Sequence, residues 1–207
     1  MGPTQVFVSG YSRVLAVATI VIAVVVVLGT VGAGDLRLTL LALSGGALAG
    51  LAGWALFWRP LVEVSDGGVR VVNVLRTIEI PWPVLDRAEV RWSLVVHTLD
   101  ARWTAWGAPR SSAAASAVRR SEQTRVDHGR PSAGLGRAVG RLPSAASAER
   151  VADAIAMRQA SLLAAGHLDG AQARARESGL KETITWHRGT IAAALTLAAL
   201  TGVLAVA

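Results

Sequence analysis

Three long apolar runs without a charged residue constrain the fold of this chain more than any other feature. The runs are Val14–Val31, Leu38–Trp58 and Thr190–Ala207. A helix rises 1.5 Å per residue, so a run of about 18 residues reaches roughly 27 Å, close to the thickness of the hydrocarbon layer of a bilayer. The sequence therefore predicts a membrane protein with a transmembrane hairpin at residues 14–58 (spans at 14–33 and 38–58) and a third transmembrane helix at residues 189–207.

The first run has an alternative interpretation as a cleaved signal peptide. Arg13 precedes it, and Val31, Gly32 and Ala33 have the small side chains of a cleavage site. However, the run is longer than the apolar region of a usual signal peptide, and a second span follows after a loop of only a few residues. We therefore favour the hairpin, which leaves residues 1–13 as a short N-terminal tail.

Basic residues flank the three spans asymmetrically. Arg13 precedes the first span, Arg59 follows the second and Arg188 precedes the third, whereas the loop between the first two holds only Asp35 and Arg37 as charged residues. Basic flanks stay in the cytoplasm. The sequence therefore predicts a multi-pass protein of the plasma membrane whose middle section is cytoplasmic.

The second span contains a face of small residues. Gly46 and Gly50 are four residues apart, and Gly53 continues the same stripe. Such a stripe lets two helices approach closely. We expect it to pack the hairpin together, with homo-oligomerisation as the alternative use.

Residues 59–110 are predicted to form an antiparallel β domain with short connections. Ser65, Asp66, Gly67 and Gly68 give a strong turn signal, and apolar residues alternate with polar ones in the segments around it. The expected strands are Leu61–Val64, Val69–Val74, Thr77–Ile80, Arg87–His97 and Arg102–Trp106. In the longest of these, Val90, Trp92, Leu94 and Val96 are expected to share one face.

The order of these features resembles a known family. Arg59-Pro60 follows the hairpin, two strands and an Asp-Gly-Gly turn come next, and four residues separate Arg76 from Pro81-Trp82. This order is similar to the bacterial PH-like domain of actinobacterial membrane proteins, the family typified by the low-molecular-weight protein antigen 6 PH domain. The resemblance implies a small PH-like β-barrel or half-barrel at the membrane surface, with Arg59, Pro60, Pro81 and Trp82 as structural signature residues. It implies no ligand.

The segment that follows differs sharply in composition. Residues 111–148 are rich in Ala, Ser, Gly and Arg and lack apolar periodicity, so they are predicted to form a flexible linker. Residues 149–188 are expected to complete the β domain with a helix, Glu149–Ala165, and a final strand, Thr183–Trp186. Ser147 is the expected N-cap of this helix and Gly166 its C-cap.

Catalytic and metal-binding patterns are absent from the sequence. The chain has no cysteine, and its four histidines (His97, His128, His167 and His187) form no metal-binding motif. The glycines of Gly134–Gly140 lack the strand and helix that a dinucleotide-binding loop needs. We therefore expect a protein that is not an enzyme, binds no cofactor or metal, and, because its arginines lack interleaved aromatic residues, binds no nucleic acid.

Three functions remain open at this point. The first is a scaffold that presents the domain to an unknown protein partner. The second is a surface that binds anionic membrane lipids, with the candidate headgroup contacts Arg70, Arg76, Arg119, Arg120 and Arg125. Glu63 and Asp66 lie beside the first hairpin and oppose this charge. The third is a small structural subunit of an envelope-assembly complex.

Overall fold

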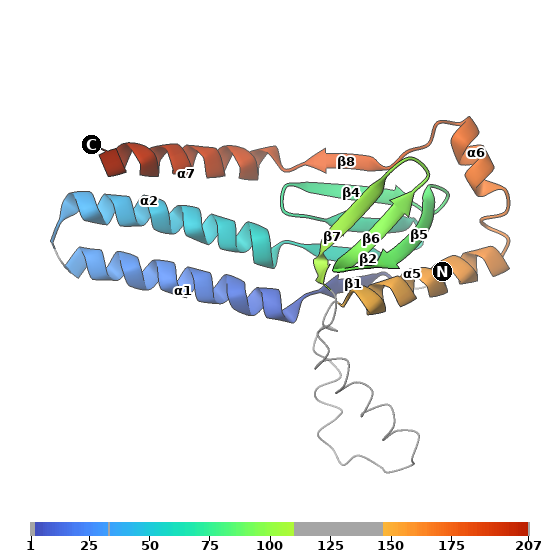
Figure 1. Cartoon of the computed structure of the whole chain (residues 1–207), viewed down its shortest axis with the longest axis horizontal. Helices are drawn as coiled ribbons and strands as arrows, with labels where there is room; N and C mark the ends of the chain where they lie inside the picture. Colours follow the sequence, from blue (N-terminus) through green and yellow to red (C-terminus); the bar gives the residue numbers. More distant parts are fainter. Residues whose placement is uncertain (1–2, 33, 110–146, 207) are drawn as a thin grey trace, which may run out of the picture.

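The computed structural model describes residues 3–32, 34–109 and 147–206, and every structural statement below concerns these residues. Three long apolar helices lie side by side at one end of the molecule, and a β domain with two smaller helices lies at the other (Figure 1). The predicted arrangement of two N-terminal apolar helices, a small antiparallel β domain and a C-terminal apolar helix is confirmed.

The long helices are α1 (Gly10–Gly32), α2 (Leu36–Gly53) and α7 (Arg188–Val206), and α2 continues into a π-helical turn, η1 (Trp54–Trp58). The central helix, α2, packs against both α1 and α7. The Asp35 carboxylate caps α2 by accepting a hydrogen bond from the Leu38 amide at 3.0 Å. All three helices are long and apolar enough to cross a membrane, and few of their residues are buried: Ala16 in α1, Ser44 and Gly53 in α2, and none in the described part of α7. A helix in a water-soluble bundle would instead bury its apolar stripe.

The first sheet has five antiparallel strands in the order β1-β2-β3-β4-β8. Its strands are β1 (Gln5–Val8), β2 (Leu61–Val64), β3 (Gly68–Val72), β4 (Arg76–Pro81) and β8 (Thr183–Trp186). The β2–β3 turn requires glycine at Gly68, because φ is 151° there and a Cβ atom would lie 2.2 Å from the Ile80 carbonyl oxygen. The strand predicted at Thr183–Trp186 is therefore present as β8. The strand β1 was not predicted, because residues 1–13 were interpreted as a short N-terminal tail.

The second sheet contains β5 (Leu85–Val90), β6 (Ser93–Thr98) and β7 (Arg102–Pro109), paired in that order. The prediction of one strand over Arg87–His97 is wrong. The chain reverses at Arg91 and Trp92, where the Arg91 amide donates a hydrogen bond to the Ser93 carbonyl oxygen at 3.0 Å, and Val90 pairs with Leu94 across the turn. Pairing the two halves with each other buries Leu94 and Val96 and leaves Trp92 exposed.

The helix α5 (Ala148–Ala164) packs against β5 and β6. Its buried side chains, among them Val151 and Ile155, join Val62, Ile78 and Leu94 in one core. Ser147 caps the helix as predicted, by accepting a hydrogen bond from the Arg150 amide. A second short helix, α6 (Ala171–Glu177), lies between α5 and β8 and was not predicted. Most of the predicted linker, residues 111–148, lies outside the described residues.

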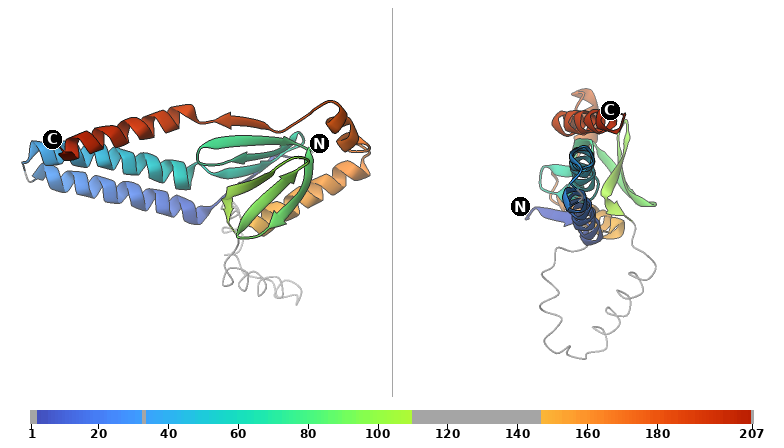
Figure 2. Two further views of the ribbon diagram at one scale, coloured as in Figure 1. Left: turned by 45° about the horizontal axis from the view of Figure 1, so that its top comes forward. Right: turned by 90° about the vertical axis from the view of Figure 1, so that its left-hand side faces the viewer.

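The first sheet is attached to the long helices at three points. β1 leads into α1, η1 leads into β2, and β8 leads into α7, so three of its five strands are continuous with a long helix. These connections are short, and Figure 2 shows the sheet directly following the helix ends. The β domain is therefore joined directly to the ends of the long helices.

Candidate functional site

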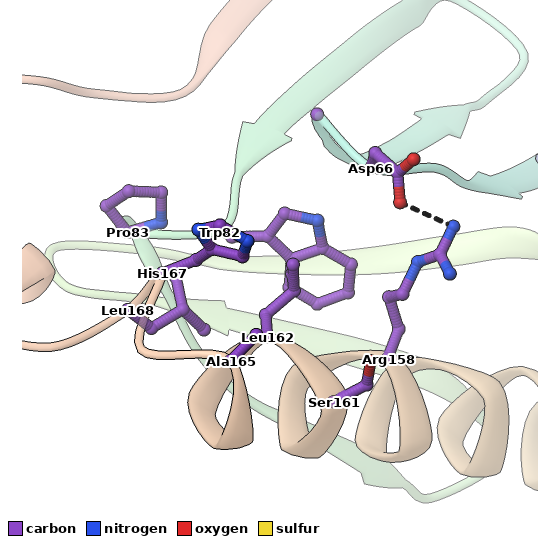
Figure 3. Close-up of a pocket in the computed structure, with 10 residues that line it drawn as sticks. Asp66, Trp82, Pro83, Arg158, Ser161, Leu162, Ala165, His167 and Leu168 are labelled. Atoms are coloured by element: carbon purple, nitrogen blue, oxygen red, sulfur yellow. Dashed lines mark ion pairs between the residues drawn. The ribbon is translucent and has the colours of Figure 1, made fainter. Parts of the chain in front are cut away.

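A groove of about 660 Å³ lies at the end of the β domain that points away from the long helices. It runs between the β2–β3 turn, the connection from β4 to β5, and the C-terminal half of α5 (Figure 3). Its walls are mainly apolar, and the polar or charged side chains of Asp66, Arg158, Ser161 and His167 also line it.

The floor of the groove depends on Trp82. Trp82 is only 3% exposed, and its indole N–H donates a hydrogen bond to the Ser65 carbonyl oxygen at 3.0 Å. The flanking Pro81 and Pro83 restrict the backbone, and the Val84 amide closes a turn onto the Pro81 carbonyl oxygen at 3.0 Å. This turn directs the indole ring inward against α5.

The end of α5 forms the opposite wall. Gly166 has a positive φ of 73°, and the His167 amide donates a hydrogen bond back to the Leu162 carbonyl oxygen at 3.0 Å. This is the pattern of a helix that ends at a left-handed glycine. It turns the chain so that His167 and Leu168 lie over the groove beside Trp82 (Figure 3).

An ion pair closes one end of the groove. An Arg158 guanidinium nitrogen lies 2.6 Å from an Asp66 carboxylate oxygen, and both side chains are partly buried. An ion pair at such a surface typically contributes about 0.2–1 kcal/mol. Because the two charges compensate each other, the groove suits a mainly apolar ligand rather than a strongly charged one.

A second cluster joins the β domain to the long helices, and we call it the collar. It consists of Arg13, Trp54, Trp58, Arg59, Arg76, Trp103 and Trp186. The guanidinium of Arg76 lies between two indole rings, 4.8 Å from the centre of Trp103 and 5.5 Å from that of Trp186. Such stacks contribute about 0.5–1 kcal/mol each at exposed sites.

Two arginines of the collar, Arg13 and Arg59, lie at the ends of the long helices. Arg13 stacks on Trp58 at 5.1 Å, and its buried Nε atom has no hydrogen-bond partner among the described residues. Arg59 stacks on Trp54 at 5.2 Å and donates a hydrogen bond to the Thr190 hydroxyl at 2.9 Å, which ties the end of η1 to α7. Partial burial lowers the pKa of Arg59 from its ordinary value.

The structure separates the residues predicted as headgroup contacts. Arg70 pairs with Glu63 at 3.3 Å and with Glu79 at 3.4 Å on the neighbouring strands, so its charge is compensated within the sheet. Arg76 belongs to the collar. The other three candidates, Arg119, Arg120 and Arg125, lie outside the described residues.

The three glycines of the predicted packing face lie in different surroundings. A Cβ atom at Gly46 would lie 3.2 Å from Val27, and one at Gly53 would lie 3.0 Å from Thr19, so both glycines face α1. A Cβ atom at Gly50 would meet no heavy atom within 4 Å in the described part of the chain. Only two of the three glycines therefore contribute to packing within the hairpin.

The signature residues fall into two sites at opposite ends of the β domain. Arg59 and Pro60 lie at the junction with the helices, whereas Pro81 and Trp82 form one side of the groove. Sequence reasoning did not identify Arg158 or His167 as groove residues. No local pattern could have done so, because the contacts join α5 to turns that are far away in the sequence.

The described residues contain no group of three or more His, Asp or Glu side chains that could hold a metal ion. The His97 Nε2 atom donates a hydrogen bond to the Glu89 carboxylate at 3.0 Å, and His187 lies between the Thr77 hydroxyl and the Val74 carbonyl oxygen. These two histidines therefore have structural partners in the β domain.

Comparisons with protein-family models, with curated proteins and with solved structures find no match to this chain.

Proposed function

We propose that this chain is a non-catalytic membrane protein that presents its β domain at the cytoplasmic face as a protein-interaction module. The three long helices are the anchor, and the groove beside Trp82 is the binding surface. The observation that carries the proposal is a mainly apolar groove on a domain that three short connections join to the long helices.

Two observations support insertion of the three helices in a membrane. They are apolar on all sides and few of their residues are buried, which matches a lipid environment. The end that adjoins the β domain has Arg13, Arg59 and Arg188, together with tryptophans that suit the headgroup region. Because basic flanks stay in the cytoplasm, the β domain is cytoplasmic in this proposal and the α1–α2 connection lies outside.

The PH-like character of the domain is part of the same proposal. It is supported by two packed antiparallel sheets and by one helix, α5, that covers β5 and β6 from beyond residues 110–146. The helix supplies the closing element that a PH-like domain needs. The added strand β8 then connects the domain to the third span.

The orientation is testable because the chain has no cysteine. A single cysteine at Leu36, the exposed first residue of α2, is expected to react with a membrane-impermeant maleimide in whole cells. A cysteine at Asp100, in the β6–β7 turn, is expected to react only after permeabilisation. Reaction at position 100 in intact cells would contradict the cytoplasmic placement.

The groove suits an apolar segment of a partner protein, because Arg158 and Asp66 compensate each other's charge. A photoreactive amino acid at Ser161, which lines the groove, is expected to form a protein adduct in cells. The same amino acid at the neighbouring, exposed Ala160 is the matched control and is expected to form none. The recovered segment, made as a peptide, is expected to bind the full-length protein in nanodiscs and to lose that binding with Leu162→Asp.

Equal crosslinking at positions 160 and 161, or a peptide whose binding is unaffected by Leu162→Asp, would argue against the groove as the binding surface. The alternative of an anionic-lipid-binding surface is favoured by the collar, where the Arg13 Nε has no protein acceptor among the described residues. That alternative predicts binding of nanodisc lipids that weakens with salt, because exposed charges are screened.

A further inference from the structure

Two exposed tryptophans lie on separate segments of the second sheet. Trp92 occupies the β5–β6 turn and is 91% exposed, and Trp106 lies in β7 and is 64% exposed. The groove residue Trp82 is almost fully buried by comparison. Large exposed aromatic side chains mark a surface that another phase or partner covers.

The contacts of β7 place Trp106 at the end of the domain next to the long helices. The adjacent Gly107 approaches the chain just after η1 so closely that a Cβ atom would lie 2.7 Å from the Leu61 nitrogen. On the other side, the Trp106 amide donates a hydrogen bond to the Asn73 side-chain oxygen at 2.9 Å, and Asn73 lies just before β4 begins. Both anchoring segments are at the helix end of the first sheet.

The strand register brings Trp92 to the same end. Ser93, which follows it, pairs with Pro109 at the end of β7. That strand packs against β1 and β2, which connect directly to α1 and η1. Figures 1 and 2 show β7 crossing the domain beside the helix ends.

The surroundings of the two rings match the headgroup region of a bilayer. Trp54, Trp58 and Trp186 are partly exposed at the same end of the domain. Arg13, Arg59 and Arg188 lie beside them, and such residues attract anionic headgroups. Indole rings prefer this region because they have a large apolar body and one polar N–H.

We propose that Trp92 and Trp106 insert into the headgroup region of the leaflet on the domain side, so that the second sheet rests against the membrane. The occupant of this surface is the bilayer itself, because the surface is continuous with the ends of the three long helices. The inference rests on the membrane insertion proposed above. It places the groove beside Trp82 on the side of the domain that faces away from the lipid.

Single cysteines test this placement in the full-length protein, which has none of its own. Positions 92 and 106 are compared with Leu163, exposed at the far end of α5, and with Val24, in the middle of α1. Each variant is labelled with the environment-sensitive dye NBD and reconstituted in vesicles of phosphatidylcholine and phosphatidylglycerol. Quenching is measured with lipids that carry a nitroxide at a shallow or a deep position, and with iodide in the water.

We expect the dye at positions 92 and 106 to be quenched by the shallow nitroxide and to emit at shorter wavelength than at position 163. The dye at position 163 is expected to respond only to iodide, and the dye at position 24 to the deep nitroxide. As a check that does not depend on labelling, the variant Trp92→Phe/Trp106→Phe is expected to show less quenching of tryptophan fluorescence by brominated lipid than the unmodified protein.

If the dye at position 24 is quenched by the deep nitroxide while positions 92 and 106 respond only to iodide, the inference is overturned and the membrane anchor stands. The two tryptophans then face the aqueous phase, where a protein partner is the remaining occupant. If position 24 also responds only to iodide, the membrane insertion of the helices is wrong, and with it this inference.

Discussion

The two ends of the β domain use tryptophan in opposite ways. At the far end, Trp82 is buried, donates its N–H to a backbone carbonyl and forms the floor of the groove. At the helix end, Trp92 and Trp106 are exposed, and Trp186 stacks on the guanidinium of Arg76. The buried Trp82 ring stabilises the folded domain, whereas the exposed rings of Trp92 and Trp106 contribute little to its stability. These two rings can contact a phase or partner outside the domain. The difference separates a structural signature residue from a surface that we propose contacts the membrane.

The sharpest test of this comparison exchanges one tryptophan at each end for alanine. Trp82→Ala removes a buried ring from the core, and we expect it to lower the free energy of unfolding by about 3–5 kcal/mol. Trp92→Ala, the matched control, removes an exposed ring and is expected to change the free energy of unfolding by less than about 0.5 kcal/mol. Urea unfolding of the full-length protein in detergent, followed by circular dichroism, measures both. Similar losses for the two variants would contradict the contrast.

The next largest effect separates the glycines of α2. Gly46→Leu places a side chain against Val27 on α1, and overpacking of this kind costs about 1–3 kcal/mol. Gly50→Leu meets no described neighbour within 4 Å and is expected to change stability by less than about 0.5 kcal/mol. Thermal unfolding in the same detergent compares them. If Gly50→Leu instead disrupts association between copies, measured by light scattering, α2 contacts a second chain there.

A smaller effect is expected in the collar. Arg76→Gln removes the cation from between Trp103 and Trp186 and is expected to lower stability by about 1 kcal/mol. The exposed Arg102, at the start of β7, provides the control, and Arg102→Gln is expected to have little effect. Equal effects of the two substitutions would show that the stacks on Arg76 add nothing beyond a surface charge.

The smallest effect concerns pH and the β5–β6 hairpin. The hydrogen bond from Arg91 at 2.8 Å, assisted by His97, lowers the pKa of the exposed Glu89 carboxyl below its ordinary value. A carboxyl with a lowered pKa stabilises the folded state above its unfolded pKa, and the contribution is lost as the pH falls through the folded pKa. We therefore expect Glu89→Gln to lower the melting temperature slightly at pH 7 and not at a pH below the folded pKa. A difference that grows in acid would reverse the sign of this linkage.

Several elements could be predicted from the sequence because local patterns encode them. The long helices follow from uncharged apolar runs, the β2–β3 turn from Ser65–Gly68, and the start of α5 from a serine cap at Ser147. The prediction of one strand over Arg87–His97 was wrong, because the alternation of apolar and polar residues does not show where a chain reverses. Val90 and Leu94 alternate correctly in both interpretations, but they face each other across a turn.

The candidate sites were less predictable than the elements. Trp82 and Arg59 were identified as signature residues, but nothing local places Trp82 in a groove with Arg158. Arg70 was predicted to be available to headgroups, yet its two carboxylate partners are on neighbouring strands, where only the sheet register brings them within 3.4 Å. Similarly, Gly46 and Gly50 belong to the same stripe of small residues in the sequence. Only the rotation of α2 relative to α1 determines that α1 covers Gly46 and not Gly50.

The sequence by itself determined which segments are apolar helices and where the chain turns between β2 and β3. These properties depend on the composition and spacing of residues within a single segment. Only the tertiary structure decided that β1 and β8 attach the first sheet to the helices, that Arg158 closes the groove onto Asp66, and that two tryptophans are exposed beside the helix ends. Those features depend on contacts between residues that are far apart in the chain. Strand pairing and burial, rather than local conformational preference, therefore determine them.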